Sequence, residues 1–404
     1  MINHKFFILF TIIATNCFVE IVKCEPELKL LHVLFRHGDK VPHTPWQSYP
    51  TDPHKNHSYF PTSNGGLTNV GKLREYKIGT MLRNRYDEFL GPYYSTDLID
   101  ARTTYVGRTH MSVQLVLAAM FPPVGEQIWN PRLSWQPIFS TYVNDVDQDY
   151  LFFPDHCHLY REEYAKFLAE DSTKKMIAKY QATLDYLTKH TGKVVDNTEA
   201  VYYLFNTLKE EAAQNLTLPE WTSSVYPHPM EEILALDFDL RSWTTNLKRL
   251  NGGNMLRKIT EDIKAVLTGN PALGKKKAFL FSGHEQNVAR LSRVLGTGEP
   301  MIPAYGSTII IETIQDREKG GNYFVRILLW TGVTERLITQ SIPGCNELCP
   351  LDEFLNLLKD VIPSDKEYLC GSEKKNSGSK LFGIKNTWVT VFVASIIVSF
   401  SSTW

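Results

Sequence analysis

Neither sign of charge is in excess in this sequence. Its 404 residues include 43 Lys and Arg and 44 Asp and Glu, so the formal net charge is −1. Proteins that bind nucleic acid carry clustered positive charge, and this balance gives no argument for a nucleic-acid partner. The sequence also lacks internal repeats. A hydrophobic content of 43% is enough for an ordinary globular core, and the length suits two domains.

The first 24 residues have the pattern of a secretory signal peptide. Lys5 precedes an apolar run over residues 6–14, and a more polar stretch that contains Cys17 leads to Cys24. The apolar run is too short to span a bilayer, and a buried helix fits poorly with the strand expected a few residues later. We therefore expect residues 1–24 to be a cleaved signal. The mature chain would be extracellular or at the cell surface, and a lysosomal location is less expected.

Cysteine is scarce, with six residues in the whole chain. Four lie outside the signal segment, and an even set in a secreted chain is typical of two disulfides, although spacing alone allows three pairings. The turn that precedes Cys345 and Cys349 favours a small local loop closed by these two. Cys157 would then pair with Cys370. A zinc site at the close pair is a weak alternative, because a second pair of ligands is missing.

Two further features agree with an extracellular chain. Asn56 and Asn215 begin glycosylation sequences, so we expect both on surface loops. A polar linker over residues 372–387 precedes a hydrophobic tail, 388–404. The tail has fewer apolar residues than a transmembrane helix needs and no basic flank, which favours a GPI-attachment signal with Asn376 or a neighbour as the attachment site. A short membrane span is the alternative.

The most informative stretch begins with an apolar run of strand length, residues 30–35, that ends abruptly in a charged turn containing Gly38. It predicts a buried strand that carries Arg36, His37 and Lys40 to the edge of a sheet, where ligands bind in α/β proteins. These three groups suit a multiply charged anion such as phosphate, and a neutral histidine among cations is a candidate nucleophile. The alternative is a solvated turn, which would need a nearby counter-charge.

A second strand with a similar ending lies far along the chain. The apolar residues 278–281 lead through Ser-Gly into His284 and Glu285, and a helical stretch follows over residues 288–295. Parallel strands in one sheet would bring this pair beside His37. On its own a His-Glu pair is usually just the capped start of a helix, so the first motif is what makes the second informative.

Arg108 is a third candidate. It lies where the loop of residues 101–112 turns into an apolar helical run, 113–120. Helix N-termini favour anions, so Arg108 could bind phosphate there. An isolated arginine in such a place more commonly caps its own turn at the surface.

A long amphipathic helix is predicted over residues 64–90, with Thr68 as its cap. Its apolar side would be formed by Val70, Leu73, Ile78, Met81 and Leu82. Gly71 and Gly79 weaken this helix unless another part of the chain packs closely against them.

The remaining pattern indicates an α/β protein with an insertion. A hairpin is predicted between residues 308–312 and 323–330. From about residue 140 to residue 235, strand-like runs disappear and helical patterns dominate. We expect an α/β catalytic domain from residues 25–139 and 236–371, and a mostly helical cap domain, 140–235, over the C-terminal edge of the sheet.

Residues 36–42 resemble the Arg-His-Gly-x-Arg-x-Pro signature of the histidine acid phosphatases, with Lys40 in place of the second arginine. Residues 66–71 and 83–86 are similar to the first helix of the prostatic and lysosomal members, and the texture is nearest to the insect venom members. The resemblance covers about residues 27–370. It implies the phosphoglycerate mutase-like, or histidine phosphatase, fold, which has a mostly parallel sheet flanked by helices and a smaller helical insertion.

The resemblance also implies roles for the candidate residues in hydrolysis of phosphate monoesters. His37 would be the nucleophile that becomes a phosphohistidine, and Glu285 would donate a proton to the leaving group. The phosphoryl oxygens would be bound by Arg36, Lys40, Arg108 and His284. Neither a metal nor another cofactor is required, because the cations supply the positive charge. Relatives imply a homodimer.

Four positions depart from the family pattern. Lys40 supplies charge without the two-pronged fork of arginine, and Glu285 replaces an aspartate that is one methylene shorter. Tyr105 and Gly107 stand where the family has acidic residues, and their loss would weaken the support of Arg108. The competing hypothesis is therefore a catalytically weakened, phosphate-ligand-binding secreted effector on the same fold. A phosphoglycerate mutase-like transferase shares the Arg-His-Gly core but has no reason to be secreted.

Overall fold

A computed structural model describes residues 26–45, 47–316 and 321–371. The expected signal peptide, the polar linker and the hydrophobic tail lie outside the described residues. Within the part of the chain that is described, no helix has both the length and the apolar character required to cross a membrane.

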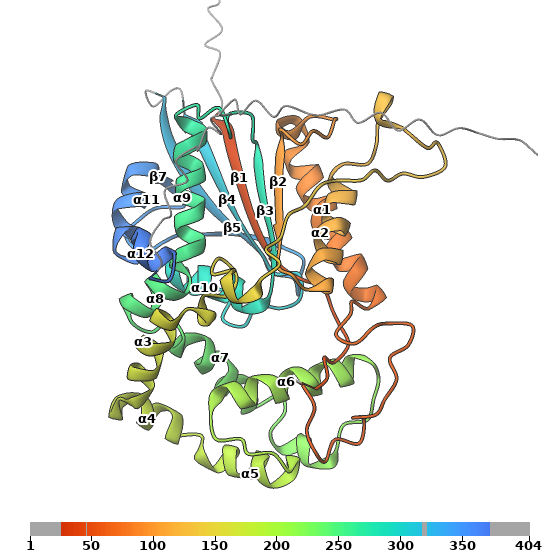
Figure 1. The fold of residues 1–404 in the computed structure, drawn as a ribbon, viewed down its shortest axis with the longest axis vertical. Coiled ribbons are helices and arrows are strands. Elements are labelled where there is room, and N and C mark those ends of the chain that lie inside the picture. The colour runs from red at the N-terminus through yellow and green to blue at the C-terminus, as the bar shows by residue number, and fades with distance from the viewer. Residues whose placement is uncertain (1–25, 46, 317–320, 372–404) are drawn as a thin grey trace, which may run out of the picture.

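A seven-stranded mixed sheet forms the centre of the protein (Figure 1). Its strands run in the order β2-β3-β1-β4-β5-β6, and β7 also pairs with β5. The strands are β1 (Glu27–Arg36), β2 (Ile99–Thr103), β3 (Ala278–Gly283), β4 (Thr308–Asp316), β5 (Asn322–Trp330), β6 (Leu337–Gln340) and β7 (Leu348–Pro350). The core strands β2, β3 and β1 are parallel, whereas β4 and the strands beyond it are antiparallel to their neighbours.

The two motif strands are neighbours. Strand β1 pairs in parallel with β3, and Arg36 lies opposite Gly283, so both strands end at the same edge of the sheet. Every residue of β3, and β1 from Leu30 onward, is buried. Continuous apolar runs are typical of strands covered on both faces, and this confirms the interpretation of both as buried strands. The predicted hairpin is also confirmed, as β4 and β5.

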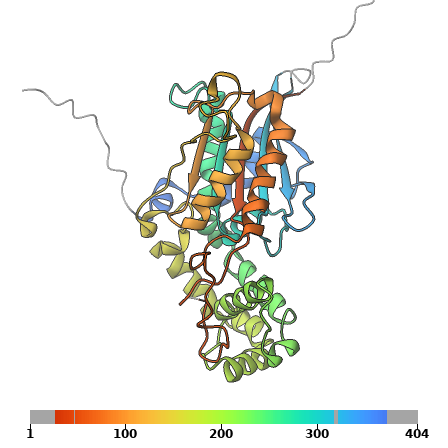
Figure 2. The ribbon, with the colours of Figure 1, turned by 90° about the vertical axis from the view of Figure 1, so that its right-hand side faces the viewer.

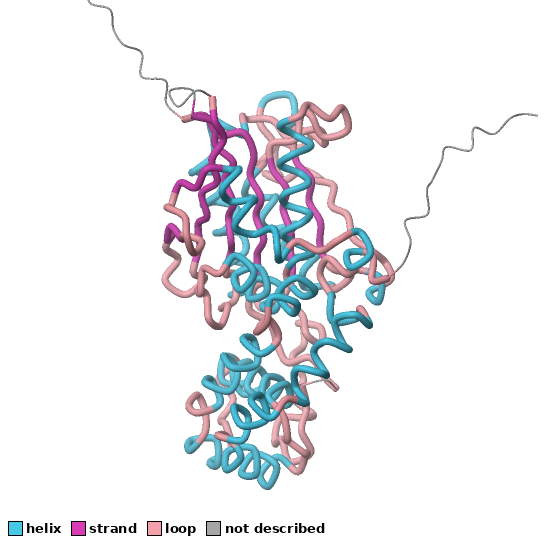
Figure 3. Tube along the Cα trace, turned by 90° about the vertical axis from the view of Figure 1, so that its left-hand side faces the viewer, coloured by secondary structure: helices cyan, strands magenta, loops and turns pink. Residues whose placement is uncertain are grey.

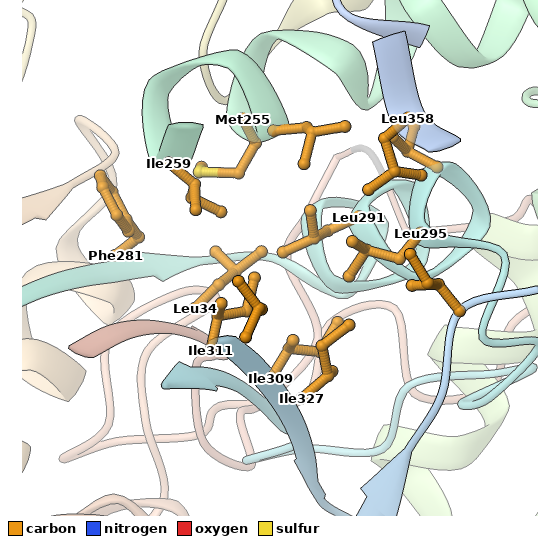
Figure 4. Packing of buried hydrophobic residues seen from close by; sticks show 14 of the residues in the cluster. Leu34, Met255, Ile259, Phe281, Leu291, Leu295, Ile309, Ile311, Ile327 and Leu358 are labelled. Carbon is orange, nitrogen blue, oxygen red and sulfur yellow. The ribbon is translucent and has the colours of Figure 1, made fainter. Parts of the chain in front are cut away.

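Helices cover both faces of the sheet (Figures 1 and 3). One face carries α1 (Asn69–Leu90) and α2 (Gly107–Met120); the other carries α9 (Gly253–Leu267), α10 (Glu285–Leu295) and α11 (Leu351–Leu358). Side chains of β1 alternate between the two sides: Val33 packs among residues of α1 and α2, whereas Leu34 packs against α9 and α10. Figure 4 shows the second cluster, in which Leu34, Ile259 and Leu291 come together.

Helix α1 begins where the sequence predicts, but its buried face differs from the prediction. The Thr68 hydroxyl accepts a hydrogen bond from the Gly71 amide at 3.1 Å and caps the helix. Val70 and Leu73, expected on the apolar side, are 62% and 58% exposed. The buried face instead contains both glycines, because their lack of a side chain lets the helix approach its neighbours: a Cβ on Gly79 would lie 2.2 Å from a backbone oxygen of α2.

The other helices form a lobe beyond the lower ends of β1 and β3 (Figures 1 and 2). We call this the helical lobe: α3 (His158–Ala169), α4 (Asp171–Ala178), α5 (Gln181–Thr191), α6 (Thr198–Ala213) and α7 (Met230–Leu240). Short helices α8 (Thr245–Asn251) and α12 (Asp365–Tyr368) lie nearer the sheet. Residues 140–235, all of them described, contribute no strand to the sheet. The segment that follows Lys40 also descends to the lobe, where Tyr49 joins a hydrophobic cluster with residues of α5, α6 and α7.

Both expected disulfides are present. Cys157 is bonded to Cys370 and Cys345 to Cys349, so the close pair has no free thiolates to offer zinc. Asn215 follows the end of α6 and is exposed, as is Asn56, which agrees with the surface positions expected of glycosylation acceptors.

Candidate active site

The sheet edge and the helical lobe enclose a cleft with a volume of about 330 Å³. All six residues proposed from the sequence line it: Arg36, His37, Lys40, Arg108, His284 and Glu285. Arg36 ends β1, and His37 and Lys40 follow it. His284 and Glu285 follow β3, and Arg108 lies in the first turn of α2. The structure therefore brings together strand ends that are more than two hundred residues apart in the chain, as parallel pairing of β1 and β3 requires.

The ring of His37 is fixed on both sides. Its Nδ1 lies 2.9 Å from the carbonyl oxygen of Gly38, and its Nε2 lies 3.0 Å from Nε of Arg108. A carbonyl only accepts and a guanidinium only donates, so Nδ1 carries the proton and Nε2 presents its lone pair. Burial, together with Arg108, Arg36 and His284, holds the pKa of His37 well below 6.5. His37 therefore keeps a nucleophilic nitrogen in mildly acidic solution.

His284 lies on the other side of Arg108. Its Nδ1 is 3.4 Å from a guanidinium nitrogen of Arg108 and its Nε2 is 3.1 Å from the Thr104 hydroxyl. Burial first, and then Arg108 and Arg36, hold the pKa of His284 well below 6.5. The ring is thus a neutral polar group at the cleft floor. The rings of His284 and His37 meet edge to face, with centroids 5.5 Å apart.

Glu285 is the first residue of α10, and its side chain is held from two directions. One carboxylate oxygen lies 2.6 Å from a guanidinium nitrogen of Arg36, and the other accepts a hydrogen bond from the Asn206 amide at 3.0 Å. Burial, and then the carboxylate of Glu285, raise the pKa of Tyr202 well above 10. Asn206 and Tyr202 belong to α6, so the helical lobe helps to place the carboxyl of Glu285.

Lys40 uses all three of its ammonium hydrogens within the protein. Its Nζ lies 2.7 Å from a carboxylate oxygen of Glu210, 2.6 Å from the Gln47 side-chain oxygen and 3.3 Å from the Val41 carbonyl. Burial lowers the pKa of Lys40 to about 8, against the opposing effect of Glu210. In acidic solution Lys40 is therefore charged, but its hydrogen bonds already have acceptors.

Sequence reasoning missed several residues of this cleft. They are Gln47, Tyr202, Asn206 and Glu210. Tyr305 does not line the cleft, but its hydroxyl donates a hydrogen bond to Glu210 at 2.8 Å. Tyr202, Asn206 and Glu210 are spaced by four residues, which places them on one face of α6. That spacing was the available signal, but nothing in the sequence says that this face, and not another, meets the strand ends.

Comparison with known proteins agrees with the family resemblance seen in the sequence. Residues 27–330 match the family model described as histidine phosphatase superfamily (branch 2). The chain belongs to this family. Three curated relatives align over most of their length. The venom acid phosphatase Acph-1 of Apis mellifera is 37% identical over 351 residues, which cover 87% of this chain and 89% of the relative.

The vertebrate relatives of this histidine phosphatase are more distant. The prostatic acid phosphatase of Homo sapiens is 30% identical over 359 residues, with 88% of this chain and 90% of that protein covered. The human lysosomal acid phosphatase is 30% identical over 350 residues, with 85% and 80% covered. The resemblance proposed from the signature is thereby confirmed.

Solved structures show the same fold at low identity. The phytase of Klebsiella sp. ASR1 superposes with a TM-score of 0.63 at 15% identity, covering 85% of this chain and 99% of that one. The tartrate complex of Hafnia alvei phytase gives 0.62 at 18% identity, covering 86% and 99%. At such identities the likeness establishes the histidine phosphatase fold and nothing more specific.

Proposed function

We propose that this histidine phosphatase is an acid phosphatase that hydrolyses phosphate monoesters through a phosphohistidine on His37. The observation that carries the proposal is the arrangement of His37: its Nε2 lone pair faces Arg108 in a buried cleft that also holds the carboxyl of Glu285. The names of the relatives, which are venom, prostatic and lysosomal acid phosphatases, support the same activity.

The reaction proceeds in two displacements. In the first, Nε2 of His37 attacks phosphorus as the ester P–O bond breaks, and protonated Glu285 gives its proton to the departing alkoxide. In the second, water attacks phosphorus, the P–N bond breaks, and the Glu285 carboxylate takes the proton of the water. Inorganic phosphate leaves, and His37 and Glu285 return to their first states.

The surrounding groups stabilise the charge on the phosphoryl oxygens. Arg36 and Arg108 offer guanidinium donors and His284 a ring nitrogen at the floor of the cleft. Lys40 contributes its charge; to bond a phosphoryl oxygen directly it must first release one of its present acceptors.

Hydrolysis of a chromogenic aryl phosphate near pH 5, by the purified mature chain, tests the proposal. We expect turnover by the wild type and a loss of roughly a thousandfold or more in His37→Ala. Rapid quenching with labelled substrate should give an adduct that is stable in alkali and lost in acid. Saturable phosphate binding without turnover in the wild type would contradict the enzyme and favour a phosphate-binding effector. A labelled phosphoserine or phosphoaspartate would contradict the role of His37.

The same proposal places the protein in the secretory pathway. Two disulfides are typical of an oxidising compartment, and Asn56 and Asn215 are accessible for glycosylation. We assign a lipid anchor to the C-terminal tail and a homodimer to the mature protein. Release of surface activity by a phosphatidylinositol-specific phospholipase tests the anchor, a mobility shift with a glycosidase tests the glycans, and the mass in solution tests the dimer.

A further inference from the structure

A carboxylate lies inside a cleft that is built to bind an anion. Glu210 projects from α6, is 1% exposed, and lines the same cleft as His37. One of its oxygens lies 2.7 Å from Nζ of Lys40, and the other accepts the hydroxyl of Tyr305 at 2.8 Å. A buried negative charge so close to a bound phosphoryl group repels it, and the repulsion grows with the charge on that group.

The charges on the cleft floor show what Glu210 changes. Three cations, Arg36, Lys40 and Arg108, face two carboxylates, Glu210 and Glu285, so the floor carries a net charge of plus one when both carboxylates are ionised. It carries plus two when Glu285 is protonated for the first step. In either state Glu210 lowers the charge by one. The two histidines of the floor add none, because their pKa values lie well below 6.5.

Other charged groups lie around this floor and are not part of the count. Asp155, which also lines the cleft, is paired with Arg290 at 2.8 Å. Lys209 of α6 does not line the cleft, and its Nζ lies 5.2 Å from the centroid of the Tyr305 ring. Its charge acts on Arg36, Glu210 and Glu285, but the change of one unit that Glu210 makes is the same with or without it. Glu211, the next residue of α6, lines a separate cavity.

We propose that Glu210 is a specificity-determining residue, which biases the cleft toward a singly charged phosphoryl group over a doubly charged one. A phosphate monoester has a second pKa of about 6, so the singly charged form is the one that predominates in acid. The inference rests on the proposed phosphate site, and it names the ionic form of the substrate that this site accepts.

Glu210→Gln removes the charge and keeps the shape. The glutamine oxygen can still accept from Lys40 and its amide can still meet the Tyr305 hydroxyl, while Lys40 retains its bonds to Gln47 and Val41. The control is Glu211→Gln, which makes the same exchange of carboxyl for amide without removing a charge, because burial, and then Asp52, raise the pKa of Glu211 to about 8 and leave it protonated at pH 5. Glu211 is also 1% exposed and adjacent on the same helix, but it faces the other cavity.

Two tetrahedral anions of different charge provide the readout. Sulfate is doubly charged and perrhenate singly charged at pH 5, and each is tested as a competitive inhibitor of aryl phosphate hydrolysis. Glu210→Gln should lower the inhibition constant of sulfate by about tenfold or more and that of perrhenate by less. The ratio of the sulfate constant to the perrhenate constant should therefore fall, which is a shift of preference toward sulfate. Glu211→Gln should leave the ratio as in the wild type. Lys40→Gln removes a positive charge and should raise the ratio. Lys40→Gln/Glu210→Gln removes one charge of each sign and should return the ratio toward that of the wild type.

An unchanged ratio of the two inhibition constants in Glu210→Gln overturns the inference. If both constants change by the same factor, Glu210 only maintains the shape of the cleft. If Glu210→Gln alone does not fold, the comparison of Lys40→Gln with Lys40→Gln/Glu210→Gln decides, since these two proteins differ only in the charge of Glu210. Failure of the proposed function looks different: neither anion would then compete with the substrate in the wild type.

Discussion

Lys40 is the side chain whose chemistry differs most from the family signature. An arginine would offer a planar fork to two phosphoryl oxygens, whereas the lysine ammonium is a point charge whose three hydrogens are accepted by Glu210, Gln47 and the Val41 carbonyl. Lysine also loses its charge far more easily than arginine. Burial brings the pKa of Lys40 to about 8, so its contribution to anion binding depends on pH within the range in which the enzyme can be assayed.

Anion affinity should therefore fall as the pH rises through about 8. A lowered lysine pKa means that Lys40 is charged below this value and neutral above it, and the neutral form no longer attracts an anion. The measurement is the inhibition constant of sulfate, which does not itself titrate, between pH 5 and pH 9. In Lys40→Arg the side chain stays charged throughout, and the rise of the constant near pH 8 should disappear. The same rise in both proteins would assign it to another group.

The six residues named from the sequence could be found because each lies at the end of a strand, in the turn that follows it, or at the start of a helix, where order along the chain predicts position in space. Glu210 could not be found in this way. It lies in the last turn of α6, in the charged sequence Lys-Glu-Glu of residues 209–211, which is typical of a solvated surface, and only the docking of α6 on the strand ends makes it part of the cleft. A helix packed against a partner far away in sequence presents a face that its own residues do not reveal.

The turn after β1 and the first turn of α1 are in direct backbone contact. A Cβ on Gly38 would lie 2.3 Å from the carbonyl oxygen of Gly71, and one on Gly71 would lie 2.1 Å from that of Asp39. Helix α1 is therefore a support for the turn that carries His37 and Lys40. This contact explains why two glycines occur in a helix that they would otherwise weaken, and why the buried face of α1 is rotated away from Val70 and Leu73.

Gly71→Ala should separate α1 from this turn. No side chain can move aside, because the added methyl meets backbone atoms, and a displacement of about 1 Å at the nucleophile can cost about a hundredfold in rate. We expect kcat/KM to fall by roughly tenfold to a hundredfold, and the free energy of unfolding to fall by about 1–3 kcal/mol. Kinetics with an aryl phosphate and denaturant unfolding measure the two effects.

The control is Gly107→Ala at the start of α2. A Cβ there meets no atom within 4 Å, so neither activity nor stability should fall. Equal losses in the two variants would show that the close approach of Gly71 is not what supports the turn.

The site as a whole is shared between two parts of the molecule, since α6 of the helical lobe supplies contacts to Lys40 and Glu285 while the sheet edge supplies His37. Local sequence patterns could not predict that the cleft is formed by residues of α6 together with residues of the sheet edge. The chain enters the lobe through α3, and the disulfide from Cys157, just before α3, to Cys370, just after α12, fastens this entry to the C-terminal end of the described chain. Figure 1 shows α3 and α12 on the same side of the molecule.

Removal of this disulfide should be the more damaging of the two possible removals. Cys157 and Cys370 are separated by 213 positions, whereas Cys345 and Cys349 are separated by four. In the chain-entropy model, opening the long loop lowers the free energy of unfolding by about 5 kcal/mol and opening the short loop by about 2 kcal/mol, because the unfolded chain gains more freedom in the first case. Guanidinium unfolding of the paired Cys→Ser variants, Cys157→Ser/Cys370→Ser and Cys345→Ser/Cys349→Ser, measures both. The short-loop variant could instead prove the less stable of the two. The fold would then depend more on local packing around residues 345–349 than on the long-range disulfide.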